Sequence, residues 1–321
     1  MRTFHVNKND AGQRLDRFLS KACPALSSGL IFKLLRKKDI KINGKRAEGS
    51  ARLAEGDVVS VYVSDALFAE REKTARDLSF APITILYEDE NILLVDKPVG
   101  LVVHEDDERS PDTLIDRIKG YLYQKGEYRP EEENSFAPSL CNRIDRNTGG
   151  IVIAAKNAES LRVLNRKLRD RELTKLYLCA VRGTPEPREA TKTAYLFKNE
   201  KENRVVVSER KTPKNRTIVT KYRVLETYGG NSLLEVDLLT GRTHQIRAHM
   251  AYLGYPLLGD GKYGDNRLNK SAGYRVQALY SYKLRFAFRT DGGILSYLDG
   301  REFTAENIWF LEKFRKSGGN V

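Results

Sequence analysis

A single carboxylate with cationic neighbours is the strongest chemical signal in this sequence. Asp145 lies between Arg143 and Arg146, and the chain continues through Asn-Thr-Gly-Gly into an apolar run at Ile151–Ala155. The run predicts a buried strand, and the residues before it predict a turn at the edge of that strand. A carboxylate held beside cations stays ionised at neutral pH and can act as a nucleophile or a base. A structural ion pair in a loop would give the same pattern.

A second group of polar side chains follows a strand predicted at residues 232–239. The letters Gly-Arg-Thr-His-Gln-Ile-Arg place Arg242, His244 and Arg247 within one short segment. A metal pair made by His244 and His249 is a competing interpretation, but no carboxylate stands at ligand spacing beside them. We therefore expect no metal site here.

The cysteines offer an alternative nucleophile. Cys23, Cys141 and Cys179 are odd in number and far apart, which is typical of free thiols in a reducing compartment, so a cytoplasmic location is expected. Cys141 lies close before Asp145, yet no base is visible near it to activate the thiol. Asp145 is therefore the preferred candidate.

The charge balance indicates a polyanionic partner. The 321 residues include 56 Lys and Arg against 43 Asp and Glu, a net charge of +13. Residues 1–63 alone hold 13 basic and 6 acidic residues, which is over half of the excess in a fifth of the chain. A nucleic acid is the expected partner, although a solvated basic surface has the same composition. No apolar run reaches the length of a membrane span.

Residues 1–63 are expected to form a small domain of helices and strands. Apolar residues at helical spacing, such as Leu15, Phe18 and Leu19, predict helices, and alternating residues predict strands. The predicted elements are a helix that ends before Pro24, a helix from Ser27 or Ser28 to about Lys37, and strands at 40–42 and 58–63 around the tight turn Asn43-Gly44.

Basic side chains concentrate on the second helix and on the hairpin that follows it. Between Ile31 and Arg46 there are seven Lys and Arg and one Asp, a density that suits contacts with phosphates. The RNA-binding candidates of this module are Arg14, Lys33, Arg36, Lys37, Lys38 and Lys41.

This module resembles the S4 RNA-binding domain. The matching pieces are Arg-Leu-Asp-Arg-Phe-Leu from Arg14, the run Arg36–Lys45, and a closing Gly-Asp-Val-Val from Gly56. The pieces are specific in combination, and the resemblance implies the fold of a small RNA-binding domain.

Residues 64–80 are charged and lack an apolar period, so we interpret them as a linker. Residues 81–321 form the expected second domain, in which strands dominate. The expected fold class is α+β, with a mixed, mainly antiparallel sheet. The expected strands lie at 83–87, 92–96, 151–155, 173–181, 232–239, 276–282 and 284–289, with several within 191–225, and the expected helices lie at 113–123, 160–171 and 305–316.

Two segments of the second domain are basic, and the first suggests further contacts with phosphates. Residues 198–221 carry eight Lys and Arg and three Glu, although solvated charge explains them equally well. The helix at 160–171 is also basic, with Leu161, Leu164 and Leu168 expected to face inward.

Four stretches of the second domain together resemble the RluA family of RNA pseudouridine synthases. They are Lys97-Pro98-x-Gly100, Arg143-Ile144-Asp145, Lys175-Leu176-Tyr177 and the segment 241–247, which is followed by Gly254–Asp260. The resemblance spans residues 83–310. With the S4-like module in front, the chain is most similar to the members that modify large-subunit ribosomal RNA.

The resemblance implies catalytic roles for three residues. Asp145 matches the aspartate that attacks the target uridine. The N1–C1′ bond then breaks, the base turns, and it rejoins through C5, with no cofactor and no metal. Arg247 matches the arginine that pairs with this aspartate and orients it. Tyr177 matches the tyrosine that stacks on the target base.

The resemblance also implies residues for binding the substrate. Arg143 matches the arginine that occupies the space left by the extruded uridine, because a base inside folded RNA must be flipped out to be reached. Arg242 and His244 are expected near the same site.

The chain departs from the family pattern at four positions. The motif His-Arg-Leu-Asp-x-x-Thr-Ser-Gly has Asn142 for His, Ile144 for Leu and Gly149 for Ser, and a second Gly is expected to make the turn more pliable. A later Ala-Leu-His motif has Tyr280 in place of His. These changes surround the expected nucleophile and leave the expected reaction in place.

The expected function is the isomerisation of specific uridines to pseudouridine in structured RNA, most of all 23S ribosomal RNA or a large-subunit assembly intermediate, by a monomeric enzyme. Transfer RNA is the alternative substrate. An RNA-binding or ribosome-assembly factor without turnover is an alternative from another class. A nucleosidase is a third, but glycoside cleavage usually uses two carboxylates.

Overall fold

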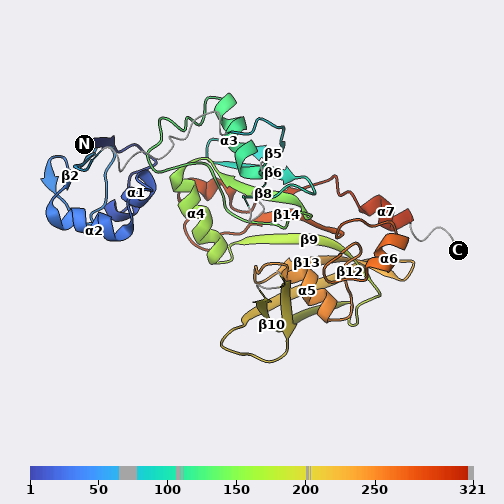
Figure 1. The fold of residues 1–321 in the computed structure, drawn as a ribbon. Helices are drawn as coiled ribbons and strands as arrows, with labels where there is room; N and C mark the ends of the chain where they lie inside the picture. Colours follow the sequence, from blue (N-terminus) through green and yellow to red (C-terminus); the bar gives the residue numbers. More distant parts are fainter. Residues whose placement is uncertain (65–77, 106–109, 111, 200–201, 203, 317–321) are drawn as a thin grey trace.

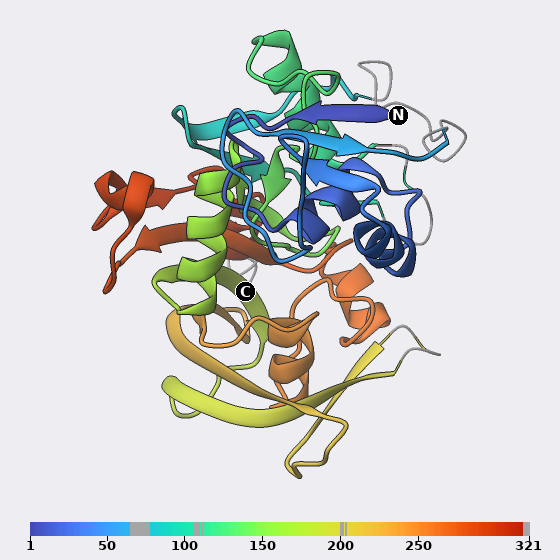
Figure 2. The same cartoon turned by 90° about the vertical axis from the view of Figure 1, so that its left-hand side faces the viewer.

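Within the residues that it describes, the computed structural model contains two sheets, one in each part of the chain. It describes residues 1–64, 78–105, 110, 112–199, 202 and 204–316. A four-stranded sheet belongs to the N-terminal module, residues 1–63, and an eleven-stranded sheet belongs to the remainder. The module lies at one end of the molecule in Figure 1 and faces the viewer in Figure 2. Most of the linker expected at 64–80 falls outside the described residues.

The N-terminal module packs two helices against its sheet, as the apolar spacing predicted. Leu15 and Phe18 of one helix and Ile31 of the other are buried in one cluster with the strand residues Ile40 and Val59. The strand order is β1-β4-β2-β3, and all pairs are antiparallel. The elements are β1 (Arg2–His5), α1 (Leu15–Ala22), α2 (Ser28–Lys37), β2 (Ile40–Ile42), β3 (Lys45–Arg46) and β4 (Val58–Val61).

The capping and turn signals of this module are confirmed. The side chain of Ser27 accepts a hydrogen bond from the N–H of Leu30 at 3.3 Å, so α2 begins where expected. Asn43 and Gly44 have φ angles of 50° and 71°, which a type I′ turn requires. Strand β1 was not predicted, because its single buried side chain, Phe4, gives no alternation to detect.

The second sheet confirms the expected α+β class. Its main path runs β11-β10-β12-β13-β9-β14-β8-β6-β5, and every pair on it is antiparallel except β14 with β8. The strands are β5 (Thr84–Glu88), β6 (Ile92–Lys97), β7 (Ser139–Leu140), β8 (Gly149–Ala155), β9 (Leu173–Arg182), β10 (Glu189–Asn199), β11 (Arg204–Ser208), β12 (Arg216–Tyr228), β13 (Asn231–Leu238), β14 (Leu279–Phe286) and β15 (Glu302–Thr304).

Helices cover both faces of this sheet (Figure 1). They are α3 (Leu114–Gln124), α4 (Ala158–Arg169), α5 (Gln245–Tyr252), α6 (Asn266–Ser271), the 3-10 helix η3 (Gly293–Leu298) and α7 (Leu311–Lys316). Ile92 and Leu94 of β6 face a core shared with α4 and α7, whereas Leu93 and Val95 face a core shared with α3 and α5. Burial on both faces explains the continuous apolar run of β6. Within the described residues, no helix has the length and apolar character to cross a membrane.

Three expectations for the second domain are wrong in detail. Gly149 and Gly150 belong to β8 rather than to a turn, because they pair with Tyr280 and Ser281 of β14. The two strands expected at 276–282 and 284–289 are one strand with a bulge. The last helix begins only at residue 311, since the residues before it are irregular and partly buried.

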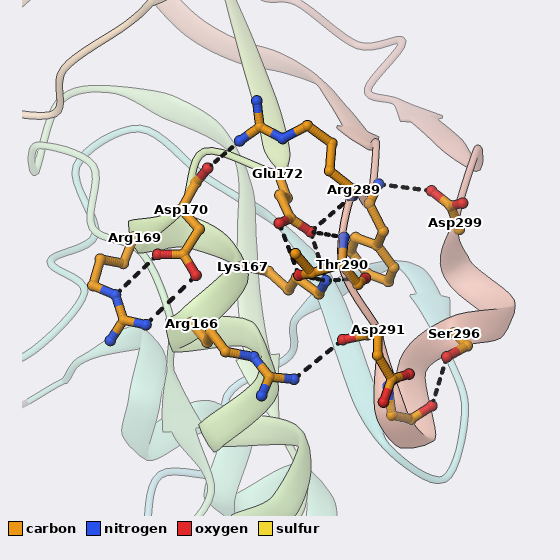
Figure 3. A network of polar contacts seen from close by, with 12 residues as sticks. Arg166, Lys167, Arg169, Asp170, Glu172, Arg289, Thr290, Asp291, Ser296 and Asp299 are labelled. Carbon is orange, nitrogen blue, oxygen red and sulfur yellow. Dashed lines mark hydrogen bonds and ion pairs between the residues drawn. The ribbon is translucent and has the colours of Figure 1, made fainter.

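The basic helix α4 is anchored by a buried cation (Figure 3). Lys167 is fully buried, and its Nζ donates to Oε2 of Glu172 at 2.5 Å and to Oγ1 of Thr290 at 2.8 Å. Glu172 also accepts the N–H of Arg289 at 3.0 Å. This network joins the end of α4 to the segment after β14. Among the leucines expected inward, only Leu164 is fully buried.

Hydrogen bonds attach the N-terminal module to the loop before β7. Asp10, which is fully buried, accepts from Oγ of Ser135 at 2.5 Å and from Nδ2 of Asn134 at 2.7 Å. Glu133 accepts from Nδ2 of Asn9 at 2.6 Å. The loop before β7 is therefore the attachment site of the module.

Candidate active site

Asp145 lies in the loop between β7 and β8 and forms an ion pair with Arg247 of α5. Nη1 of Arg247 donates to Oδ2 of Asp145 at 2.9 Å. The Asp145 side chain is 23% exposed, whereas that of Arg247 is 9% exposed. Among the described residues, no group donates to Oδ1 of Asp145. Arg247 thus holds one carboxylate oxygen, and the side chain remains partly exposed.

Arg247 is itself held by a second carboxylate, that of Asp260. Nε and Nη2 of Arg247 donate to Oδ2 and Oδ1 of Asp260 at 2.7 Å and 3.0 Å. Burial alone would raise the pKa of the fully buried Asp260, but Arg247 and the N–H groups of Lys262 and Tyr263 hold it below its ordinary value. Sequence reasoning assigned Asp260 no role, although it ends the motif Gly254–Asp260.

The loop that carries Asp145 is fastened by Lys97, the lysine of the Lys-Pro-x-Gly motif. Its Nζ is fully buried and donates to the carbonyl oxygens of Pro98, Leu101 and Arg146 at 2.9, 2.7 and 3.0 Å. Burial lowers the pKa of Lys97 to about 7, and the carboxylates of Asp145 and Asp96 oppose this shift. The contact to the Arg146 carbonyl connects β6 directly to the residue after Asp145.

The arginines adjacent to Asp145 are not its ion-pair partners. Arg143 is exposed, with no ion pair to another described residue. Nη2 of Arg146 reaches Oγ of Ser110 at 3.3 Å, and its carbonyl binds Lys97. The cation beside the carboxylate comes from a distant part of the chain, so local sequence could not identify it without the family resemblance.

His244 lies next to the ion pair at the start of α5. It has a left-handed backbone with φ of 53°. Its Nε2 lies 3.9 Å from Oδ2 of Asp145, and its Nδ1 lies 2.9 Å from the hydroxyl of Tyr263. Burial lowers the pKa of His244 below its ordinary value, while the Asp145 charge opposes this.

The second histidine of the competing metal interpretation has a different partner. Nδ1 of His249 lies 2.9 Å from Oγ1 of Thr220, and burial lowers its pKa to about 4. Within the described part of the chain, no group of three His, Cys, Asp or Glu side chains is placed to hold a metal ion.

Tyr177 lies under the site on β9. Only 5% of it is exposed, and it packs in one core cluster with Ile144 and Ile246, which flank Asp145 and Arg247 in the sequence. Burial raises the pKa of Tyr177 to about 12, and the negative charge of Asp145 contributes.

Arg242 is exposed just before α5. Burial also raises the pKa of Cys141 to about 12, so it is a neutral thiol rather than a competing nucleophile.

The basic candidates of the N-terminal module lie mostly on its surface. Lys33, Arg36, Lys37 and Lys38 are exposed, and Lys41 is half-buried with its Nζ over the ring of Tyr62 at 5.1 Å. Arg14 differs, because its Nη2 already pairs with Oδ2 of Asp16 at 2.5 Å.

Comparisons with known proteins identify the family of this chain. Residues 91–252 match the family model described as RNA pseudouridylate synthase, and residues 13–59 match the S4 domain. The chain is 32% identical over 297 residues to ribosomal large subunit pseudouridine synthase C of Escherichia coli (strain K12), covering 89% of this chain and 88% of the relative. The enzyme of that name from Vibrio cholerae serotype O1 is 29% identical over 289 residues, covering 88% of this chain and 87% of the relative.

A solved structure has the same fold. Human RNA Pseudouridylate Synthase Domain Containing 4 superimposes with a TM-score of 0.57 at 22% identity, covering 72% of this chain and 93% of that chain. The chain belongs to the family of RNA pseudouridylate synthases and carries an S4 domain at its N-terminal end.

Proposed function

We propose that this RNA pseudouridine synthase acts on ribosomal RNA of the large subunit, with Asp145 as its nucleophile. The position of Asp145 carries the proposal. Oδ2 is held by Arg247 at 2.9 Å, while Oδ1 has no donor among the described residues. The names of the relatives support the choice of RNA, because both are ribosomal large subunit enzymes.

The reaction balances without any added reagent. Attack by Asp145 on the target nucleoside allows the N1–C1′ bond to break. The freed base turns, C5 bonds to C1′, and the bond between Asp145 and the nucleoside breaks. A proton leaves C5 and N1 gains one. Substrate and product are isomers, so an ionised and oriented carboxylate is the main requirement.

Other residues of the site would bind and orient the uridine. Arg247 would keep the carboxylate ionised and aligned, and the ring of Tyr177 would form the floor under the base. Arg143 projects into solvent beside the nucleophile and would fill the gap left in the RNA. Arg242 and His244 would complete the rim.

The N-terminal domain, proposed as residues 1–63, would hold the RNA through phosphates. Many of its lysines and arginines are exposed, and the module lies beside the catalytic domain, proposed as residues 81–321 (Figure 1). We propose that one chain acts as a monomer in the cytoplasm, since RNA-binding and catalytic parts occur together and the three cysteines are free. Light scattering of the purified protein tests the monomer.

The test is release of tritium from C5 of uridine. Ribosomal RNA of each subunit and transfer RNA, all labelled at C5, are incubated separately with wild type, Asp145→Asn and Asp170→Asn. Asp170 is a matched control, because its carboxylate pairs with Arg169 on the surface. We expect release from large-subunit RNA by wild type and Asp170→Asn only.

Other results would exclude parts of the proposal. Tritium release from transfer RNA alone would exclude large-subunit RNA as the substrate. Wild-type release by Asp145→Asn would exclude Asp145 as the nucleophile. Tight binding of RNA without release from any substrate would favour an RNA-binding or assembly factor. Carbodiimide mapping of pseudouridine in cells with and without the gene would identify the position.

A further inference from the structure

Tyr263 contacts two side chains of the active site, those of His244 and Arg247, and has no role in the proposed function. Its hydroxyl lies 2.9 Å from Nδ1 of His244, and the two rings meet edge to face at 5.7 Å. The guanidinium of Arg247 lies over its ring at 5.3 Å. The Tyr263 side chain therefore touches both groups that lie beside Oδ2 of Asp145.

Tyr263 is fixed by contacts that do not involve His244. Its backbone N–H donates to Oδ1 of Asp260 at 3.1 Å. Its hydroxyl oxygen accepts the N–H of Val205 on β11 at 3.1 Å, and the guanidinium of Arg204 covers the ring at 5.1 Å. With the tyrosine anchored on both sides, the histidine is the partner that is positioned.

The hydrogen bonds determine where the proton of His244 lies. The Tyr263 hydroxyl oxygen already accepts the N–H of Val205, and among the described residues the acceptor within reach of its single hydrogen is Nδ1 of His244. Burial keeps the imidazole neutral at pH 7, and a neutral imidazole carries a single N–H. That N–H is then at Nε2, the nitrogen that faces Oδ2 of Asp145 at 3.9 Å.

We propose that Tyr263 is a positioning residue that holds His244 in the tautomer with its proton on Nε2, so that a second N–H faces Oδ2 of Asp145 beside Arg247. A contact of 3.9 Å in a substrate-free enzyme tightens when the substrate binds. Two donors on Oδ2 leave Oδ1 as the attacking oxygen. This inference rests on the proposed role of Asp145 as nucleophile.

The test combines nitrogen NMR of labelled histidine with single-turnover tritium release from large-subunit RNA. The chain has 4 histidines, so the His244 signals are assigned by comparison with His244→Gln. The variant is Tyr263→Phe, which keeps the ring and removes the hydroxyl, both the donor to His244 and the acceptor of the Val205 N–H. The control is Tyr274→Phe, because Tyr274 is 4% exposed and its hydroxyl has no hydrogen-bond partner among the described residues.

We expect wild type and Tyr274→Phe to show His244 protonated only at Nε2, with equal rates. Tyr263→Phe should show a mixture of tautomers and a rate at saturating RNA about fivefold to tenfold lower, the size expected for one neutral hydrogen bond. A wild-type signal from Nδ1–H would overturn the proposal even if the variant fails to fold. The proposal would also be overturned if folded Tyr263→Phe kept the wild-type tautomer of His244 or the wild-type rate.

The failure of this inference is distinguishable from failure of the proposed function. If Asp145→Asn is inactive while Tyr263→Phe behaves as wild type, only the role of Tyr263 is lost. If Asp145→Asn retains wild-type tritium release, Asp145 is not the nucleophile, and Oδ1 is not the attacking oxygen.

Discussion

The ring of Tyr280 fills the space that any side chain at position 149 would need. A Cβ added to Gly149 would overlap with the ring of Tyr280, which lies on the neighbouring strand of the sheet. The Tyr280 hydroxyl donates to Oδ1 of Asp96 at 2.6 Å, so the ring is fixed in place. Two departures from the family pattern, Gly for Ser and Tyr for His, are therefore one packing arrangement.

We expect Gly149→Ser to lower the free energy of unfolding by about 1–3 kcal/mol, because extra atoms must enter a filled core. Combining Gly149→Ser with Tyr280→His should recover part of the lost free energy of unfolding, because the smaller ring leaves room for the new side chain. Urea unfolding measures both. Gly29→Ser is the control, because a Cβ there meets no atom within 4 Å. Equal losses in the single and double variants would refute the coupling of Gly149 and Tyr280.

Asp260→Asn should damage both stability and activity. It removes the charge that holds Nε and Nη2 of Arg247 at 2.7 and 3.0 Å in a buried site. Breaking one side of a buried ion pair costs about 3–5 kcal/mol, and a loosened Arg247 no longer aligns Asp145, so tritium release should fall as well. Glu189→Gln, which breaks an exposed pair with Lys221, should change stability by less than about 1 kcal/mol. Wild-type tritium release by Asp260→Asn would show that Arg247 needs no second carboxylate.

The network in Figure 3 should make the fold sensitive to acid. The hydrogen bond from Lys167, followed by those from Arg289 and Thr290, lowers the pKa of Glu172 from 4.5 to about 2. A carboxyl group with a lowered pKa stabilises the fold fully above its unfolded pKa and loses this contribution as pH falls through the folded pKa. The difference in stability between wild type and Glu172→Gln should be largest near neutral pH and shrink between pH 4.5 and about 2.

Denaturant unfolding at a series of pH values measures this difference. Glu312→Gln is the matched control, since Glu312 is 88% exposed and pairs with Lys316 within one helix. Its effect should be near zero at every pH. A difference in unfolding free energy between wild type and Glu172→Gln that stays constant down to pH 2 would contradict the lowered pKa of Glu172.

The basic cluster Arg36, Lys37 and Lys38 should act by binding phosphates alone. All three side chains are exposed at the end of α2. Replacing them with Ala should weaken RNA binding and reduce the slope of log K against log salt by about 0.7–0.9 for each phosphate that is no longer neutralised. The single-turnover rate at saturating RNA should not change.

A matched control removes equal charge at the other end of the molecule. Lys313, Arg315 and Lys316 lie on α7, far from the N-terminal module in Figure 1. Their replacement with Ala should leave the salt slope unchanged. The same decrease of the slope in both triple variants would mean that total charge, rather than this surface, governs binding.

Sequence reasoning succeeded where the signal is local. The N-cap at Ser27, the turn at Asn43-Gly44 and the apolar run of β8 each depend on a few adjacent residues. The family resemblance supplied the pairing of Asp145 with Arg247, which lies in another part of the fold. Asp260 and Tyr263 escaped notice, because their roles follow from contacts with Arg247 and His244 that only the folded chain creates.

The contact between Asp10 and the loop before β7 predicts how the two domains act together. Asp10 is fully buried and accepts hydrogen bonds from Ser135 and Asn134. Asp10→Ala would leave these donors unpaired and loosen the module. Because the active-site residues lie in the other domain, the rate at saturating RNA should persist, while the RNA concentration needed for half-maximal rate should rise.

Hydrogen exchange and kinetics together test this coupling. Residues 1–63 should exchange faster in Asp10→Ala, while the strands around Asp145 keep their protection. Glu55→Ala is the control, because it removes an exposed carboxylate from the same module. A fall in the rate at saturating RNA, with protection of the module unchanged, would mean that Asp10 supports the catalytic domain directly. A rise only in the RNA concentration needed for half-maximal rate means that the fixed module helps to bind the RNA with its uridine near Asp145.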